Sequence, residues 1–228
     1  MKPQHCKNSG PTAQPGFSTG LWRGFYRATG ASLGWFAVLA QYYLSIGESG
    51  LAAGTGFFFG YFTILGNMLV ASAFLAPFAA GRGRFFERPG VRTAIAVYIL
   101  VIAIVFHVLL RQLYHPVGLG WYVNLLLHYI MPPLYILDWV LFVPKQNLRF
   151  SQIPYWLIFP LAYATATLAH GALSGYYPYP FLDAGKYGYG RVLPNIAGLT
   201  GFFLLLSAGF VGVAKLPKRA LAPGRGLG

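Results

Sequence analysis

The sequence predicts an all-α membrane protein, a bundle of six transmembrane helices with the N and C termini in the cytoplasm. Hydrophobic residues make up 56% of its 228 residues and charged residues only 9%, whereas a soluble domain carries about 25% charged residues. Six apolar stretches follow one another along the chain, each long enough to cross a hydrocarbon core of about 30 Å. Basic residues gather in alternate loops, and that asymmetry sets the orientation.

Helices are preferred over barrel strands because the apolar stretches do not alternate. Ala94–Leu110 is apolar almost throughout, whereas a barrel strand alternates polar and apolar residues over about ten positions. In lipid, only helices and closed barrels satisfy every backbone hydrogen bond. Together the spans form one transmembrane domain, residues 25–214. The predicted spans are 25–46, 57–79, 91–113, 121–143, 153–174 and 192–214.

A polar segment, residues 1–24, precedes the first span and contains Pro, Gly, Ser and Gln. It is interpreted as a flexible basic arm in the cytoplasm. The first span has a competing interpretation, because residues 38–40 (VLA) before Gln41 resemble a signal-peptide cleavage site. Apolar residues continue as far as Ile46, so a span that is retained in the mature protein is preferred.

The breaks between the spans carry glycine and proline. Residues 81–90 separate spans two and three, and residues 144–147 separate spans four and five. The longest loop after the first span is 175–191, with the sequence GYYPYPFLDAGKYGYGR. Tyrosine rings favour the headgroup level of a membrane, so this loop is expected to form an ordered lid at the interface. Residues 215–228 are predicted to be a basic cytoplasmic tail.

Lysine and arginine are divided unevenly between the two sets of loops. The chain has 17 of them against four acidic residues, a net charge of +13. Three lie on the side away from the termini: Arg111, Lys186 and Arg191. A nucleic-acid-binding face would not follow loop parity, so no nucleic-acid partner is expected. The fourteen on the side of the termini are Lys2, Lys7, Arg23, Arg27, Arg82, Arg84, Arg88, Arg92, Lys145, Arg149, Lys215, Lys218, Arg219 and Arg225.

Four polar residues inside the spans are candidates for a functional site. Ionisable groups in a membrane are costly, and they mark functional sites more often than other positions do. Counting 1.5 Å per residue from the span ends, we expect Thr63, His107, His128 and His170 to lie within about 5 Å of one another in depth. This layer falls in the outer third of the bundle.

Helical spacing adds the direction in which these side chains point. Asn124, His128 and Tyr135 follow one stripe of span four that continues to Asp138, and a stripe of this kind faces the bundle interior. Span five carries a similar stripe of Tyr163, Thr167, His170 and Ser174, and Thr63 shares a face with Asn67 on span two. The stripes predict a polar cavity near the outer leaflet.

Two other features of span four have structural interpretations. Asp138 lies about 15 Å below His128, near the cytoplasmic end, where it is expected to pair with Lys145 or Arg149, or to anchor the helix at the interface. Residues 132–133 are both proline and are expected to kink the helix just after His128. The kink would free backbone carbonyl groups, which can line a cavity.

Three segments carry a family resemblance: YFTILGNMLVA (61–71), LLHYIMPPLYILDWVLFVPK (126–145) and GYYPYPFLD (175–183). They resemble a group of bacterial six-pass integral membrane proteins. That group is similar to the androgen-induced protein and androgen-dependent TFPI-regulating protein family, six-pass hydrolases of fatty acid esters of hydroxy fatty acids. The resemblance implies a multi-pass protein of the bacterial cytoplasmic (inner) membrane that acts on a membrane lipid or fatty-acyl ester.

The same resemblance implies that Thr63 is the nucleophile and His128 its partner. A threonine hydroxyl needs a nearby base to take its proton, and a neutral histidine serves as that base and then protonates the leaving alkoxide. Asn67 and Asn124, one turn away, are candidate donors to the oxyanion. No acidic residue shares the layer, so a dyad is expected, with the histidine oriented by a tyrosine or a carbonyl group. Further candidates for substrate or oxyanion contact are His107, His170 and Tyr135.

Two alternative functions fit the same residues. The three histidines of the layer, on three different spans, would suit a bundle that binds haem or a metal, although the preferred interpretation has no cofactor and no metal. A transporter or a structural scaffold is the other alternative, since residues 132–133 break one helix. The single cysteine, Cys6, excludes an intramolecular disulfide. The sequence carries no signal for the oligomeric state.

Overall fold

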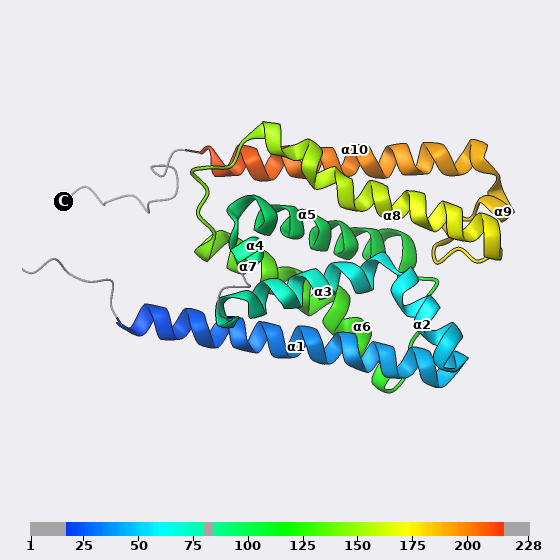
Figure 1. The fold of residues 1–228 in the computed structure, drawn as a ribbon, viewed down its shortest axis with the longest axis horizontal. Coiled ribbons are helices and arrows are strands. Elements are labelled where there is room, and N and C mark those ends of the chain that lie inside the picture. The colour runs from blue at the N-terminus through cyan, green and yellow to red at the C-terminus, as the bar shows by residue number, and fades with distance from the viewer. Residues whose placement is uncertain (1–16, 80–83, 217–228) are drawn as a thin grey trace, which may run out of the picture.

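The computed structural model describes residues 17–79 and 84–216, and within them it contains helices and no strand. The long helices lie side by side in one bundle (Figure 1). The helices are α1 (Phe17–Ser49), α2 (Leu51–Gly60), α3 (Phe62–Leu75), α4 (Arg84–Glu87), α5 (Pro89–Val105), α6 (Leu119–Leu125), α7 (Met131–Phe142), α8 (Ile153–Ser174), α9 (Ala184–Tyr187) and α10 (Tyr189–Ala214). Short 3-10 or π turns are η1 (Ala76–Phe78), η2 (Phe106–Leu110), η3 (Leu126–Ile130), η4 (Phe150–Gln152) and η5 (Pro180–Leu182).

Within the described residues, four helices are long and apolar enough to cross a membrane: Pro89–Leu110, Leu119–Phe142, Phe150–Ser174 and Tyr189–Ala214. They correspond to predicted spans three to six. The bent pair α2–α3 makes a fifth if it is counted as one span. These helices are those of a multi-pass membrane protein. Helix α1, which contains predicted span one, is not among them, because Arg27, Gln41 and their Gly, Ser and Tyr neighbours dilute its apolar residues.

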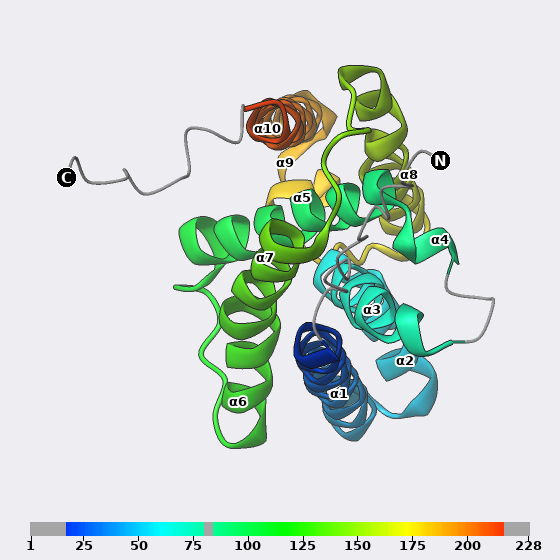
Figure 2. The ribbon, with the colours of Figure 1, turned by 90° about the vertical axis from the view of Figure 1, so that its left-hand side faces the viewer.

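Helix α5 lies at the centre of the bundle, in contact with α3, α7 and α10 (Figure 2). Most of its side chains are buried, which explains why its sequence is apolar on every face. Helix α1 packs against α2 and α3, and α8 packs against α10. Helix α1 begins and α10 ends at the same end of the molecule (Figure 1).

The second predicted span is broken, which corrects the prediction of one continuous helix over 57–79. Helices α2 and α3 meet at an angle of 76°. Tyr61 between them is extended, with φ −90° and ψ 125°. The hydroxyl group of Tyr163 donates to the carbonyl oxygen of Gly60 at 2.7 Å, and the ring of Phe62 packs on the Tyr163 ring. The break therefore starts a new helix directly before Thr63, and Thr63 lies in the N-terminal turn of that helix.

The N-terminal arm is shorter than predicted. Helix α1 begins at Phe17, so residues 17–24 belong to a helix rather than to the flexible arm. The remaining residues of the predicted arm, and residues 217–228 of the predicted tail, lie outside the described residues.

Asp138 does not pair with Lys145 or Arg149 as expected. Its carboxylate accepts from Arg27 at 2.7 Å and from Arg92 at 2.6 Å, and all three side chains are buried. The stripe of α7 that carries Asp138 faces α1 and α5, so the arginines of those helices reach it first. Lys145 instead donates to the carbonyl oxygens of the last turn of α7, a common role for lysine at a helix C terminus.

The two prolines of span four follow a widened turn. Pro132 and Pro133 lack the N–H groups that the carbonyl groups of His128 and Tyr129 would otherwise bind. The preceding turn, η3, is a π turn, and η2 on the neighbouring span is another. Single π turns occur frequently at functional sites. Here they bring the rings of Phe106 and His128 into a stack with a centroid distance of 3.7 Å.

Candidate functional site

Thr63 and His128 lie together inside the bundle. The Oγ1 atom of Thr63, in the first turn of α3, is 3.4 Å from Nε2 of His128 in η3. His128 is buried. The sequence predicts that these two residues lie at one depth, and depth alone does not determine contact. The distance is within reach of a proton transfer, since such bonds are often loose before substrate binds.

The hydrogen bonds of His128 define which ring nitrogen carries the proton. Its Nδ1 atom is 3.2 Å from the carbonyl oxygen of Asn124. A carbonyl oxygen only accepts, so Nδ1 is the protonated nitrogen and Nε2 carries the lone pair. The lone pair faces the hydroxyl group of Thr63. The imidazole is therefore in the tautomer that a general base requires, and a carbonyl group orients it, as the sequence suggested.

A third residue, Tyr179, completes this cluster. The backbone N–H of Thr63 donates to its phenol oxygen at 3.3 Å, and the Thr63 Oγ1 atom lies 3.4 Å from the same oxygen. Tyr179 is buried, and burial raises the pKa of its hydroxyl group to about 12. The phenol therefore keeps its proton at physiological pH and remains a donor.

Tyr179 is not among the site residues that the sequence predicts. The 175–191 loop, predicted to be an ordered lid, packs over the α2–α3 break, where Tyr176 donates to the hydroxyl group of Tyr61 at 3.1 Å. The loop holds five tyrosines, however, and nothing in their spacing shows which one turns inward. The stack of Tyr179 on Phe181, with centroids 5.2 Å apart, is visible only in the structure.

The two asparagines have different positions. Asn67 donates through Nδ2 to the carbonyl oxygens of Thr63 at 2.9 Å and of Leu127 at 3.3 Å, and so ties α3 to η3. It lines neither cavity described below and is better placed to hold the two helices together than to contact an oxyanion. Asn124 lines the larger cavity, and its side-chain oxygen has no partner among the described residues.

Three predicted site residues lie elsewhere. His107 is exposed on the bundle surface, beside the hydroxyl group of Tyr129 at 3.3 Å. His170 is also exposed, next to Ser174. Tyr135 is fully buried against the ring of Phe74 and lines neither cavity. The predicted layer concerned depth alone, and equal depth does not fix the direction of a side chain around its helix, so His107 and His170 do not reach Thr63.

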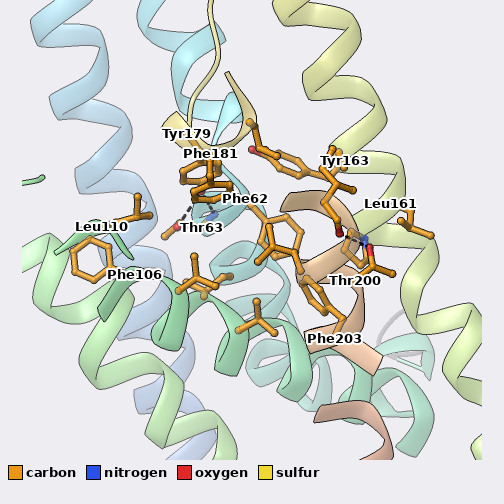
Figure 3. Close-up of a pocket in the computed structure, with 18 of the residues that line it drawn as sticks. Phe62, Thr63, Phe106, Leu110, Leu161, Tyr163, Tyr179, Phe181, Thr200 and Phe203 are labelled. Atoms are coloured by element: carbon orange, nitrogen blue, oxygen red, sulfur yellow. Dashed lines mark hydrogen bonds between the residues drawn. The ribbon is translucent and has the colours of Figure 1, made fainter. Parts of the chain in front are cut away.

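Two cavities meet at Thr63. The smaller has a volume of about 80 Å³ and lies between α3, α5, α8 and α10 (Figure 3); we call it the apolar cavity. The larger has a volume of about 380 Å³ and lies between α1, α2, η3 and the 175–191 loop; we call it the polar chamber. His128 lines only the polar chamber. The residues that line both are Thr63, Phe106, Leu110 and Tyr179.

The described residues hold no group of three or more His, Cys, Asp or Glu side chains close enough to bind a metal ion. His107, His128 and His170 have separate hydrogen-bond partners. No family model, curated protein or solved structure matches the chain. Inference about its function therefore depends on the geometry around Thr63.

Proposed function

We propose that the protein is an intramembrane hydrolase of acyl-ester lipids, with Thr63 as the nucleophile and His128 as the general base. One observation supports this most directly: the unprotonated Nε2 atom of His128 faces the Thr63 hydroxyl group at 3.4 Å, at the boundary between two cavities. A hydroxyl nucleophile, a base in hydrogen-bond reach and an orienting group for the base are the parts that acyl transfer needs.

In the first half of the reaction, Thr63 Oγ1 attacks the ester carbonyl carbon while His128 Nε2 takes the hydroxyl proton. We propose two donors for the oxyanion that forms: the hydroxyl group of Tyr179, whose oxygen lies 3.4 Å from Thr63 Oγ1, and the backbone N–H of Thr63, which donates to that phenol oxygen before substrate binds. The N–H lies in the N-terminal turn of α3, where the helix dipole favours negative charge. Collapse of the intermediate breaks the bond to the alcohol, which leaves with the proton from His128.

In the second half, water attacks the acyl group on Thr63 while His128 removes a proton from the water. The acyl bond to Thr63 breaks, the fatty acid leaves, and the proton returns from His128 to the threonine oxygen. His128 has no carboxylate beside it; the carbonyl group of Asn124 holds the ring through both halves. A dyad of this kind keeps the tautomer fixed without burying an extra charge.

The location that we propose is the bacterial cytoplasmic membrane, with six spans, both termini cytoplasmic and Thr63 toward the outer leaflet. Lys145, Arg149 and Lys215 support this orientation, since they lie at the end where α1 begins (Figure 1). Lys186 and Arg191 lie at the opposite end, with the 175–191 loop. Lipid esters would reach the site laterally from the membrane. The resemblance implies esters of hydroxy fatty acids as one candidate class.

The test is a screen of lipid esters with purified protein, combined with labelling by a fluorophosphonate probe. Thr63→Ala is expected to lower hydrolysis by about 10³-fold or more and to abolish labelling, because no hydroxyl group remains at the centre. Thr63→Ser should retain both. Thr165→Ala is the matched control, since Thr165 is exposed and bonds only the Leu161 carbonyl of its own helix. Labelling of Thr63→Ala at the wild-type level would rule out the proposed nucleophile.

A further inference from the structure

The two cavities differ in which catalytic groups they contact. Thr63 and Tyr179 line both, whereas His128 lines only the polar chamber. Thr63 therefore lies on the wall between them, and the carbonyl carbon of a bound ester would sit at that wall. The two halves of the ester then extend into different cavities.

The position of His128 decides which half goes where. The alkoxide that leaves must receive its proton from His128 Nε2, and the water that follows must give its proton to the same atom. Both proton transfers therefore take place in the polar chamber, the cavity that His128 lines. The alcohol half therefore occupies the polar chamber, and water takes its place after the alcohol has left. The acyl half occupies the apolar cavity.

The lining of the apolar cavity suits a hydrocarbon chain (Figure 3). Its few polar groups already have partners: Tyr163 donates to Gly60 and Thr200 to Ile196. The volume of about 80 Å³ is roughly half that of a 150 Å³ cavity that holds benzene. It accepts the first few carbons of a chain. Leu161 in its wall is 42% exposed, so a longer chain continues there toward the lipid.

The polar chamber presents hydrogen-bond acceptors and one negative charge. Among the described residues that line the chamber, Glu48 is the single formally charged side chain. Glu48 forms no salt bridge with another described residue. Ser45 and Ser49 lie in the same wall. The side-chain oxygen of Asn124, beside His128, is a buried acceptor that has no partner in the part of the chain that the structure describes. Hydroxyl groups satisfy such acceptors, whereas a carboxylate would be repelled by Glu48.

On the premise that the proposed hydrolysis is correct, we propose that the preferred substrates are acyl esters of an uncharged, hydroxyl-bearing alcohol of the glycerol type. The acyl chain lies in the apolar cavity and the glycerol in the polar chamber. Esters whose alcohol half carries a free carboxylate, such as those of hydroxy fatty acids, are poorer substrates because of Glu48.

The first test compares two esters with the same acyl chain in vesicles that contain the full-length protein. One is a monoacylglycerol, and the other is the ester of a hydroxy fatty acid. The wild type is expected to favour the monoacylglycerol in kcat/KM by about five- to tenfold, as one charge near a partly hydrated site allows. Glu48→Gln should reduce the preference, and Glu48→Lys should reverse it. Glu87→Gln, at the other end of the molecule, is the control.

The second test addresses the acyl half. Ala164 lines the apolar cavity, and Ala164→Phe would fill it. Hydrolysis of long-chain monoacylglycerols should then fall by about tenfold or more relative to acetyl esters. Ala166→Phe is the control, because Ala166 is an exposed residue of the same helix that lines neither cavity. An unchanged chain-length preference in Ala164→Phe would place the acyl chain elsewhere.

The two proposals fail in different ways. If hydrolysis is absent or does not depend on Thr63, the proposed function is wrong and the inference falls with it. If hydrolysis depends on Thr63 but both esters react equally, or Glu48→Lys leaves their ratio unchanged, the alcohol half is not selected by this chamber. The proposed hydrolase function would still stand.

Discussion

Tyr179 differs from the other two residues of the candidate site because it comes from a loop. Thr63 is on helix α3 and His128 on the π turn η3. The phenol oxygen of Tyr179 reaches the same point from the 175–191 loop, where it accepts from the N–H of Thr63. The stack with Phe181 holds its ring. The loop therefore supplies one donor of the proposed oxyanion site and is not only a cover.

Tyr179→Phe removes this donor and leaves the ring in place. We expect kcat for ester hydrolysis to fall by about 10²-fold, as the loss of one oxyanion donor does elsewhere, with little change in KM. The measurement is steady-state hydrolysis by wild type and variant.

Tyr176→Phe is the control for that substitution, since the hydroxyl group of Tyr176 bonds Tyr61 and not Thr63. Burial raises the pKa of Tyr179 to about 12, so the wild type keeps the neutral phenol as far as pH 10. The wild-type advantage over Tyr179→Phe should therefore persist at that pH. Equal rates for wild type and Tyr179→Phe would remove Tyr179 from the mechanism.

At the scale of elements, the break between α2 and α3 places the nucleophile. A continuous helix would bury the N–H of Thr63 in its own hydrogen-bond ladder. Tyr61, with its extended backbone, is the N-cap of α3, which begins at Phe62, so the N–H of Thr63 has no partner within its own helix and donates to the phenol oxygen of Tyr179 instead. Helix α2 must hold its angle for this geometry to persist, and it does so by packing on α1.

Gly54 is the closest point between α2 and α1. A Cβ atom there would lie 2.7 Å from the Cα atom of Ile46 and closer still to the carbonyl oxygen of Ser45. Gly54→Ala would therefore push the helices apart, with an expected loss of about 1–3 kcal/mol of stability and reduced hydrolysis. Thermal unfolding in detergent and the hydrolysis rate measure the two effects.

Gly56→Ala is the matched control in the same helix, because nothing lies within 4 Å of its added Cβ. Alanine favours a helix over glycine, so this variant should be at least as stable as the wild type. A Gly54→Ala protein with wild-type stability and activity would show that the close contact does not hold the break.

At the scale of the whole molecule, one buried ion cluster joins three helices. Arg27 of α1 and Arg92 of α5 both donate to Asp138 of α7, and Arg92 also donates to the carbonyl oxygen of Ala73 at 2.7 Å. The cluster lies between α1, α5 and α7. It fixes their relative positions rather than taking part in the proposed chemistry.

Asp138→Asn removes the carboxylate and leaves two buried guanidinium groups without a counter-charge. The expected loss of stability is about 3–5 kcal/mol, measured by unfolding in detergent. Glu87→Gln, which neutralises an exposed carboxylate on α4, should change stability by less than about 0.5 kcal/mol. Equal stability of the two variants would contradict the structural role of the cluster.

The orientation in the membrane is testable through Cys6, the chain's one cysteine. With cytoplasmic termini, as loop charge predicts, a membrane-impermeant maleimide should leave Cys6 unlabelled in intact spheroplasts and label it after permeabilisation. A Cys6→Ser protein carrying a new cysteine at Ser174, in the exposed C-terminal turn of α8, should be labelled without permeabilisation. The reverse pattern would invert the topology.

Much of the fold was predictable, because apolar runs in a chain with few charges must be membrane helices. The positions of spans three to six follow from that rule alone. The break at Tyr61 was not predictable, since residues 57–79 are apolar on both sides of it and the bend depends on contacts with Tyr163 from another helix. The pairing of Asp138 was not predictable for the same reason. Lys145 and Arg149 are its basic neighbours in the sequence, whereas helix packing places Arg27 and Arg92 beside it.

The sequence by itself determined the helical class, because hydropathy is a local property. It predicted one depth for Thr63 and His128 by counting the helix rise along continuous spans. Only the tertiary structure decided that these two face each other while His107 and His170 turn outward. It also decided that Tyr179 completes the cluster and that two unlike cavities meet at Thr63. Depth is counted along one helix, whereas the direction of a side chain matters only relative to its neighbours, and those neighbours are set by packing of distant segments.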